Sequence, residues 1–324
     1  MIKLSIVIPV YNVEKYIEKC IRSIITQRID DKYEYEILIV NDGTKDDSMS
    51  IVSKFTADYN IRVINKENGG LSSARNLGLK YCIGDYVWFV DSDDTIPDES
   101  LNMIFRNIEK TSSEVLFFDI FKVDEATGST CYKKMYASEE SLTKSGIEWM
   151  LTGDDIWPMA QMYVFKKQFL DCHHLVFKEG ILHEDVEFRF RFMAVAKYVT
   201  YIPCSIYNYL LRNSGSISSG FNVKRVYDLR DIVLSEIDYA EKSLEEHSSK
   251  LYLPIYRNFE NFISFVVNNN VTENESHSKD VYKVVKPHLK TSLTDASMKY
   301  KCKIILAIIS LSLLKMFIKI RNLL

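Results

Sequence analysis

The sequence predicts an α/β protein with a mostly parallel central sheet, flanking helices and a helical C-terminal region. Apolar runs at residues 4–12, 36–40, 61–64 and 86–90 predict strands buried on both faces. The segments between these runs carry apolar residues at helical spacing. Residues 221–324 continue in a helical pattern. Alternating strands and helices imply right-handed crossovers and an open sheet.

The individual elements follow from local pattern. The first strand contains Pro9 and ends at Asn12, and isoleucines on one face predict a helix over 13–27. The second strand stops at the turn 41–44, where Gly43 supplies a permissive backbone. Beyond the fourth strand we expect a helix, another strand at 115–119 and a hairpin at 122–134.

Length and composition restrict the class of protein. The 324 residues can bury a sizeable core, and 47% hydrophobic with 26% charged residues exclude a disordered chain. The sequence has no self-similarity at any period, which excludes a solenoid or a propeller. Six cysteines without paired spacing, and an N-terminus that starts directly in a strand, predict reduced thiols and a cytoplasmic location.

Charge is distributed unevenly. From His277 onward there are ten Lys and Arg against two Asp, a net charge of +8. Because the whole chain has a net charge of −3, residues 1–276 have a net charge of −11. An acidic body argues against a nucleic-acid partner, and a basic tail suggests an anionic membrane surface. Residues 301–324 join an apolar stretch to this basic end, but Lys315 interrupts it before the ~20 residues that a spanning helix needs. We expect a helix in the membrane interface, with packing in a helical core as the alternative.

Three carboxylates follow the fourth strand within four positions: Asp91, Asp93 and Asp94. In an extended chain, Asp91 and Asp93 point the same way and can face one object. Clustered carboxylates repel each other unless a cation lies between them, so Mn²⁺ or Mg²⁺ bridging phosphate oxygens is the expected ligand. An acidic, solvated turn is the alternative interpretation.

Other polar loops converge on the same edge of the sheet, because ligands of open α/β sheets bind beyond the carboxyl ends of the strands. The glycine pair that opens the segment 68–76 can bring backbone N–H groups close to phosphate. Tyr11 can offer its ring to a base, Asp42 an acceptor and Arg75 a forked donor. Each residue also has a simpler interpretation: Tyr11 as a core aromatic residue, Asp42 as a turn residue and Arg75 as a surface cation.

Four segments carry a family resemblance: residues 5–12, 39–44, 68–76 and 89–94, in this order. Together they closely resemble the family 2 glycosyltransferases of the GT-A fold, which are inverting, metal-dependent enzymes that use nucleotide sugars. The match is dense over roughly the first hundred residues and reappears at 183–188 and 207–218. The fold that the resemblance implies is the Rossmann-like GT-A fold.

The resemblance also implies roles for residues of the donor site. Tyr11 would stack on or flank uracil, Asp42 would bond its imide, Arg75 would contact the nucleotide, Asp91 the ribose and Asp93 the metal, Mn²⁺ or Mg²⁺. Asp94 has no assigned role beyond capping a helix or supporting its neighbours. The predicted donor-binding residues are Pro9, Tyr11, Asp42, Arg75, Asp91, Ser92 and Arg212.

Inversion requires a base that deprotonates the acceptor hydroxyl. Family members carry a Glu-Asp pair, which Glu184 and Asp185 match, so we expect Asp185 to be the base and Glu184 to orient substrate. Acidic residues at a helix N-terminus are the alternative explanation. His183, which precedes this pair, is interpreted as a residue at the start of the helix rather than as a metal ligand. The segment 207–218, with Arg212, is expected to close over the diphosphate.

The predicted function is transfer of a hexose from a nucleotide sugar, favoured as a UDP-sugar, to a hydroxyl of a glycan or lipid-linked glycan acceptor. The setting would be synthesis of a surface polysaccharide, capsule or exopolysaccharide, at the inner face of the cytoplasmic membrane. A nucleotidyltransferase is disfavoured, because residues 10–14 lack a glycine-rich basic loop. A nucleotide-sugar-binding scaffold without turnover is the remaining alternative.

The predicted domain organisation has two parts. Residues 1–220 form the nucleotide-sugar-binding and catalytic domain, with a donor half at 1–100 and an acceptor half at 101–220. Residues 221–324 form the helical C-terminal region, which ends in the basic amphipathic tail 301–324.

Overall fold

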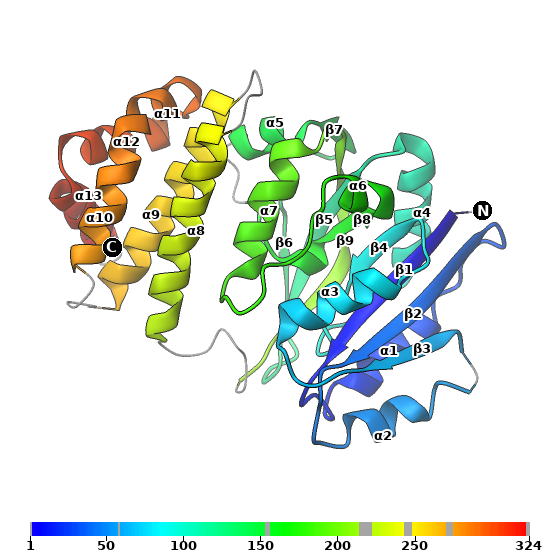
Figure 1. The fold of residues 1–324 in the computed structure, drawn as a ribbon. Coiled ribbons are helices and arrows are strands. Elements are labelled where there is room, and N and C mark those ends of the chain that lie inside the picture. Colours follow the sequence, from blue (N-terminus) through cyan, green and yellow to red (C-terminus); the bar gives the residue numbers. More distant parts are fainter. Residues whose placement is uncertain are drawn as a thin grey trace. The chain divides into compact units, whose positions relative to one another are not determined.

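The computed structural model of the protein describes residues 2–57, 59–152, 156–213, 222–242, 248–269 and 275–321. It contains two compact units (Figure 1). The first comprises Met1–Gly146, Asp154–Gly180 and Val195–Ser219, and the second comprises Ile147–Gly153, Ile181–Ala194 and Gly220–Leu324. The segment 181–194 therefore lies in the second unit, although it precedes the expected domain boundary at residue 220. The boundary itself stays a prediction.

The first unit is built on one sheet in the order β3-β2-β1-β4-β8-β5-β9-β7, with β6 paired to β5. Its strands are β1 (Ile2–Val10), β2 (Tyr33–Asn41), β3 (Ile61–Asn65), β4 (Tyr86–Phe89), β5 (Val115–Asp124), β6 (Thr130–Lys133), β7 (Leu142–Lys144), β8 (Tyr163–Lys166) and β9 (Val199–Leu211). The first four strands pair in parallel, and β5 is parallel to β9, whereas β6, β7 and β8 run antiparallel to their neighbours. The predicted mostly parallel sheet and the hairpin around residue 127 are confirmed.

Strand order places the switch point of the sheet between β1 and β4. Register pairs Val10 with Asn41 on one side of β1 and Val7 with Phe89 on the other. The chain crosses outward from β1 to β2 and β3, then returns to β4 on the opposite side. A crevice opens beyond the carboxyl ends of strands at such a point. This is where the predicted donor loops begin.

Helices cover the sheet because each has one apolar face. Those of the first unit are α1 (Ile17–Ile25), α2 (Ser48–Ser53), α3 (Leu71–Tyr81), α4 (Ser100–Thr111) and α6 (Lys167–Cys172), with the short 3-10 turn η1 (Ala160–Met162). Helix α3 packs on β1 and β2. Gly78 permits this contact, since a Cβ there would lie 2.2 Å from a methyl carbon of Val7.

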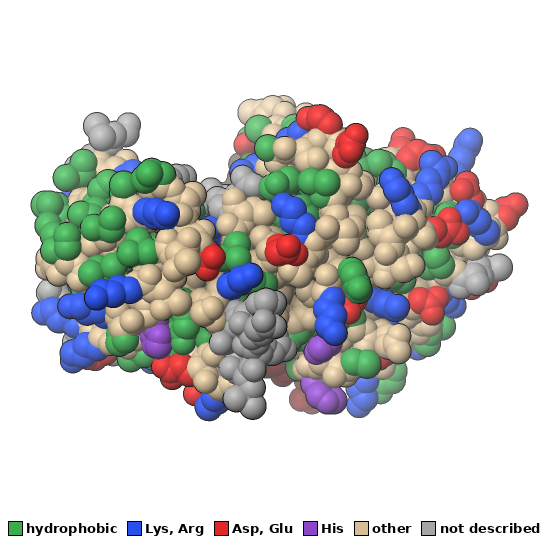
Figure 2. Space-filling view, turned by 90° about the horizontal axis from the view of Figure 1, so that it is seen from above, with side chains coloured by type: hydrophobic (Ala, Val, Ile, Leu, Met, Phe, Trp, Pro, Cys, Tyr) green, Lys and Arg blue, Asp and Glu red, His purple; other side chains and the backbone are tan. Residues whose placement is uncertain are grey.

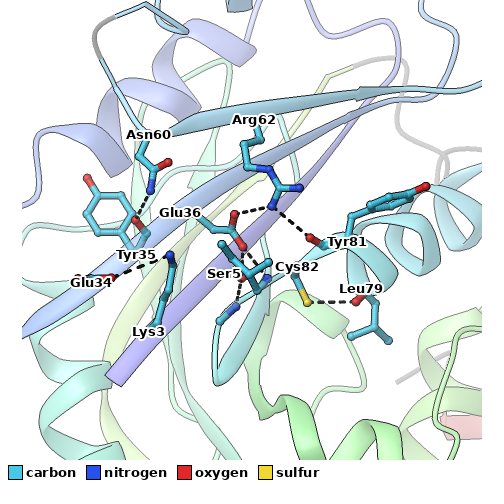
Figure 3. Close-up of polar contacts among 12 residues, drawn as sticks. Lys3, Ser5, Glu34, Tyr35, Glu36, Asn60, Arg62, Leu79, Tyr81 and Cys82 are labelled. Atoms are coloured by element: carbon cyan, nitrogen blue, oxygen red, sulfur yellow. Dashed lines mark hydrogen bonds and ion pairs between the residues drawn. The ribbon is translucent and has the colours of Figure 1, made fainter. Parts of the chain in front are cut away.

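A buried carboxylate joins several strands at the end of the sheet remote from the crevice (Figure 3). Glu36 on β2 accepts hydrogen bonds from the Ser5 hydroxyl at 2.6 Å, the Ile83 N–H at 2.8 Å and the Arg62 guanidinium at 2.9 Å. The Gly84 N–H donates in turn to the Ser5 hydroxyl at 2.8 Å. One side chain thus links β1, β2, β3 and the turn before β4.

The second unit is helical, as expected for the C-terminal region. Its helices are α5 (Gly146–Leu151, of which residues 147–151 belong to this unit), α7 (Glu184–Val195, of which residues 184–194 belong to it), α8 (Val223–Lys242), α9 (Tyr252–Asn268), α10 (Glu275–Val285), α11 (Leu289–Asp295), α12 (Met298–Ile309) and α13 (Leu311–Arg321), with 3-10 turns η2 (Ser248–Leu251) and η4 (Lys286–His288). Glu260 on α9 accepts from buried Lys303 at 2.6 Å and from Arg321 at 3.2 Å. This cluster ties the last two helices to α9.

The basic tail forms two helices instead of one, because the chain leaves helical geometry at Ser310. One face of α12 and α13 packs into the unit and buries Ile304, Ala307, Leu314 and Ile318. The other face exposes Ile305, Ile309, Met316 and Ile320. Figure 2 shows hydrophobic side chains gathered beside Lys and Arg at this end of the chain. No described helix is long and apolar enough to cross a membrane.

Candidate functional site

The first two carboxylates of the acidic loop after β4 each meet an arginine. Asp91 accepts from Arg75 Nη2 at 2.8 Å, and Arg75 is only 2% exposed at the start of α3. Asp93 accepts from Arg212 Nε at 3.0 Å, and Arg212 follows β9. Four residues predicted for the donor and metal sites, from three separate segments of the sequence, therefore lie together at the switch point of the sheet. Residues 214–218 of the expected closing loop lie outside the described residues.

Asp94 has a different environment, and its partners on β9 were not identified from the sequence. It is 1% exposed and accepts from the Tyr207 hydroxyl at 2.6 Å and from the Leu210 N–H at 2.7 Å. The Tyr207 hydroxyl in turn accepts from the Asp91 N–H at 3.1 Å. This network joins the acidic loop to β9, two residues before Arg212. Its only signal in the sequence was the third carboxylate of the loop.

Asp42, at the end of β2, holds the glycine loop. Its carboxylate accepts from the Gly69 and Gly70 N–H groups, each at 2.9 Å, and from Lys66 Nζ at 2.5 Å. We expected these glycine amides to approach a phosphate, and in this structure they bond Asp42 instead. Lys66 was also missed, because nothing in its local sequence identifies a partner at the end of the neighbouring strand.

The remaining predicted donor residues surround these pairs. Pro9 lies within β1 opposite Val40, and Ser92 is 6% exposed between the two paired carboxylates. Tyr11 is 46% exposed just beyond β1, which leaves its ring accessible to a flat ligand. Asn12 follows with a φ of +53°, and its N–H donates to the Thr44 hydroxyl at 2.8 Å. The end of β1 is thereby tied to the turn after β2.

Electrostatics in the acidic loop favour a cationic ligand. Burial and the neighbouring Asp91 raise the pKa of Asp93, and Arg212 only partly offsets this. Burial, Asp93 and Asp91 raise the pKa of Asp94 as well. Among the described residues, no group of three His, Cys, Asp or Glu forms a metal cage. Asp93 and Asp91 instead fit a hard cation that takes one or two carboxylates and completes its shell with substrate phosphates.

A cavity of about 360 Å³ opens beside Asp93. Tyr16 and Glu125 line it, and the Tyr16 hydroxyl donates to Glu125 at 2.7 Å. The Arg212 guanidinium lies 5.4 Å from the centre of the Tyr16 ring, and the Asn213 N–H donates to Glu125 at 2.8 Å. The segment that carries Arg212 is therefore fastened to the hairpin β5–β6 and to the start of α1. The cavity is lined by Lys15, Tyr16, Lys19, Asp93, Thr95, Val123, Asp124, Glu125, Gly128, Asn208 and Leu210.

The predicted catalytic pair lies in the second unit, in the first turn of α7. The Val186 N–H donates to the Asp185 carboxylate at 2.8 Å, and Glu184 precedes it. His183 has a φ of +64°, a left-handed conformation that is uncommon outside glycine. Glu184 and Asp185 thus occupy a helix N-terminus, which is the position that the alternative interpretation predicted. Such a position stabilises a carboxylate and leaves its role in proton transfer open.

The arrangement in the first unit can bind a polyanion with a hydroxylated group attached. Arg75 and Arg212 are forked donors suited to phosphate, and the carboxylates between them can accept hydroxyl groups or hold a cation. All predicted donor-site residues, together with Asp93, lie in this unit.

Comparison with known proteins gives a consistent result. The family model described as "Glycosyl transferase family 2" matches residues 5–171. The chain is 31% identical over 267 residues to "Glycosyltransferase GlyA" of Streptococcus pneumoniae, covering 79% of this chain and 37% of that protein. It is 29% identical over 251 residues to "Poly(ribitol-phosphate) beta-N-acetylglucosaminyltransferase TarS" of Staphylococcus aureus, covering 76% of this chain and 42% of that protein.

The chain thus spans less than half of these two relatives. Its fold is similar to the crystal structure of S. aureus TarS in complex with UDP-GlcNAc, with a TM-score of 0.76 at 21% identity. That similarity covers 97% of this chain and 90% of the other.

Proposed function

Because this chain belongs to glycosyl transferase family 2, we propose that it transfers a hexose from a UDP-sugar to a hydroxyl of a glycan acceptor, with inversion at the anomeric carbon. The observation that carries the proposal is the pair of Arg–Asp contacts at the switch point, Arg75 with Asp91 and Arg212 with Asp93. They place cations and carboxylates where a nucleotide diphosphate and its sugar can bind together.

Each donor residue has a proposed task that its surroundings support. Exposed Tyr11 flanks the uracil, buried Pro9 two residues earlier fixes the end of β1 beneath it, and Asp42, held by Lys66, borders the base. Asp91 and Ser92 face the ribose, with Arg75 orienting Asp91. Arg212 offsets charge on the departing diphosphate. The binding of UDP-GlcNAc by TarS supports uridine as the base.

A divalent cation, Mn²⁺ or Mg²⁺, is proposed at Asp93, with Asp91 beside it. When bound, it would offset the negative charge of the diphosphate leaving group. The raised pKa of Asp93 supports this assignment, because a cation at that carboxylate relieves the repulsion from Asp91. Arg212, whose Nε lies 3.0 Å from Asp93, would then turn to the diphosphate.

Asp185 is proposed as the base that takes the proton of the acceptor hydroxyl, with Glu184 orienting the acceptor or the sugar. Direct attack on the face opposite the diphosphate gives a β-linked product from an α-linked donor. Support comes from the family pattern at these two positions and from the fixed geometry of Asp185 at the start of α7. The rival scaffold would bind the same donor without using this carboxylate.

The proposed acceptor is a lipid-linked glycan of a surface polysaccharide, with the enzyme in the cytoplasm and held peripherally at the membrane. One relative is named as a minor teichoic acid biosynthesis protein and another as a poly(ribitol-phosphate) beta-N-acetylglucosaminyltransferase, and both names support a surface polymer. The exposed apolar face of α12 and α13, flanked by Lys319 and other cations, supports contact with an anionic lipid surface.

The proposal predicts that one UDP-sugar is turned over in the presence of Mn²⁺. In a panel of UDP-, GDP- and TDP-sugars, hydrolysis or transfer should fall at least a hundredfold in Asp93→Ala, because that change removes the metal carboxylate. Asp185→Asn should abolish transfer while donor binding, followed by calorimetry, persists. The exposed control Asp47→Asn should match the wild type.

A protein that binds no nucleotide sugar with metal present would refute the enzyme proposal. Equal transfer by wild type and Asp185→Asn would remove Asp185 from the base role. Tight donor binding without turnover, even with a glycan acceptor extract, would favour the scaffold.

A further inference from the structure

Two lysines of the sheet unit place their ammonium groups beside one tryptophan. Lys122 Nζ lies 4.3 Å from the centre of the Trp157 ring, and Lys133 Nζ lies 5.6 Å from it. All three side chains are half-buried. The Tyr163 hydroxyl donates to the Trp157 carbonyl oxygen at 2.7 Å, which fixes the backbone that carries the ring. The indole is therefore held in place with two positive charges next to it.

These two charges have no counter-charge. Among the residues that the structure describes, the side chain of neither Lys122 nor Lys133 forms a hydrogen bond or an ion pair. Lys134, the next residue along the chain, bonds Glu139 at 2.5 Å. The face of an indole attracts an ammonium group, but two like charges beside one ring repel each other, and partial burial reduces the screening by water. An anion that contacts both ammonium groups would remove this repulsion.

The two lysines lie on the face of the sheet that leads to the acidic loop. Lys133 pairs with Ile120, two residues before Lys122, so both lysines are on one face of the hairpin β5–β6. Lys122 pairs in turn with Tyr209 of β9, which places Tyr209 on the same face. Burial and the nearby carboxylates of the acidic loop raise the pKa of the Tyr209 hydroxyl. A row of side chains thus connects the lysines with the predicted donor site.

The chemistry of this group favours one class of ligand. Lysine ammonium groups bind phosphate and carboxylate as point charges. An indole packs against the carbon-bound hydrogens of a sugar or a polyol. A neutral glycan would use the ring and leave both charges uncompensated, and a hydrocarbon chain would in addition remove water from them. The three side chains therefore fit an anion that is attached to a sugar or a polyol.

We propose that Lys122, Lys133 and Trp157 form a subsite for an anionic acceptor glycan. A phosphate or carboxylate group of the acceptor binds the two ammonium groups, and the adjoining sugar or polyol packs against the indole. The inference rests on the proposed function and deepens it, because it makes the acceptor a charged polymer and assigns residues of the sheet unit to it.

The test measures how three oligomers of matched length protect the tryptophans of the full chain from quenching by acrylamide. The probes are an oligomer of glycerol phosphate, an oligosaccharide of hyaluronan, which carries carboxylates, and a neutral cello-oligosaccharide. The chain has three tryptophans, of which Trp88 and Trp149 are 0% and 1% exposed, so quenching reports mainly on Trp157. We expect at least one anionic probe to protect Trp157 and the neutral probe to leave quenching unchanged.

Two double variants separate the subsite from general charge attraction. Lys122→Gln combined with Lys133→Gln should weaken binding of the anionic probe at least tenfold, because it removes both charges and keeps Trp157 as the reporter. The charge-matched control, Lys110→Gln combined with Lys134→Gln, removes two lysines of the same unit that lie outside the subsite. It should bind the probe as the wild type does. Calorimetry with UDP-sugars and Mn²⁺ on all samples reports on the donor site.

Protection by glycerol phosphate alone identifies phosphate as the anion, protection by hyaluronan alone identifies carboxylate, and protection by both shows that the subsite recognises charge. The inference is overturned if neither anionic probe protects Trp157, if the neutral probe protects it equally, or if the double variant at Lys122 and Lys133 binds like the wild type. If a UDP-sugar binds and no anionic probe protects, only this inference fails. If an anionic probe protects and no UDP-sugar binds, the proposed function fails, and the assignment of the anion to an acceptor fails with it.

Discussion

The charged residues of the predicted donor site are arranged in pairs. Asp91 with Arg75 and Asp93 with Arg212 balance charge at the end of β4, and Asp94 is buried behind them. Asp94 accepts two hydrogen bonds, and its partner Tyr207 also receives the Asp91 N–H. Asp94 is thus a positioning residue that holds the acidic loop and the strand leading to Arg212 in one arrangement.

Tyr207→Phe should lower both stability and donor affinity. The change leaves the buried Asp94 oxygen and the Asp91 N–H without their partner, at a cost of about 1–3 kcal/mol for each. Urea unfolding should show this loss of stability. Calorimetry should show donor affinity reduced about tenfold, which corresponds to a loss of ~1.4 kcal/mol of binding free energy. The control is Tyr198→Phe, at a 58% exposed position just before β9. Wild-type donor affinity in Tyr207→Phe would contradict the positioning role.

At the scale of elements, the sheet is secured at both ends by carboxylates. Asp42 and the acidic loop organise the carboxyl ends of β2 and β4, while Glu36 joins β1, β2 and β3 at the opposite end (Figure 3). Burial alone would raise the pKa of Glu36, but hydrogen bonds from Ser5, Ile83 and Arg62 lower it below its ordinary value. The folded structure therefore stabilises the ionised form of Glu36.

The lowered pKa of Glu36 predicts an acid-dependent loss of stability. Its contribution is complete above the unfolded-state pKa, near ~4.3, and is lost as the pH falls through the folded-state value. Glu36→Gln should cost about 1–3 kcal/mol at pH 7, because an amide N–H₂ then faces the Arg62 donor. Urea unfolding at pH 7, 5 and 3.5 should show the gap to wild type narrowing at the lowest pH. Exposed Glu34→Gln on the same strand is the control, and a gap independent of pH would contradict the assignment.

At the scale of the whole molecule, the predicted site residues, which the sequence analysis placed in one domain, fall in both units. The predicted donor residues and Asp93 belong to the sheet unit, and the predicted catalytic residues Asp185 and Glu184 belong to the helical unit. The last two helices pack one face into that unit through Ile304, Leu314 and Ile318. Removing residues 301–324 would therefore expose a core face, and substitutions on the outer face test membrane contact more cleanly.

Replacing two outer residues, Ile309→Ser with Met316→Ser, should weaken binding to anionic vesicles about tenfold or more. The two side chains are 61% and 55% exposed, so their loss leaves the core intact. Each contributes ~1 kcal/mol of apolar burial to a lipid interface. Co-sedimentation with phosphatidylglycerol vesicles measures the effect. Ile83→Ser, 60% exposed on the sheet unit, is the control. Unchanged sedimentation would show that the tail makes no membrane contact.

The sequence by itself determined the fold class, the order of the first four strands along the chain and the loops that bear the predicted donor residues. These follow from local pattern, since apolar runs form buried strands and their polar ends must meet at one edge of a parallel sheet. Arg75 and Asp91, and Arg212 and Asp93, were named from separate motifs, and the structure brings each pair into contact.

Only the tertiary structure decided which partner each side chain meets. The contacts of Lys66 with Asp42 and of Tyr207 with Asp94 join residues that are distant in sequence. The same holds for the tail, where hydrophobic pattern could not distinguish a membrane face from a packed face. Both faces of α12 and α13 carry apolar residues. The face that packs against α9 and α11 is the one that is buried.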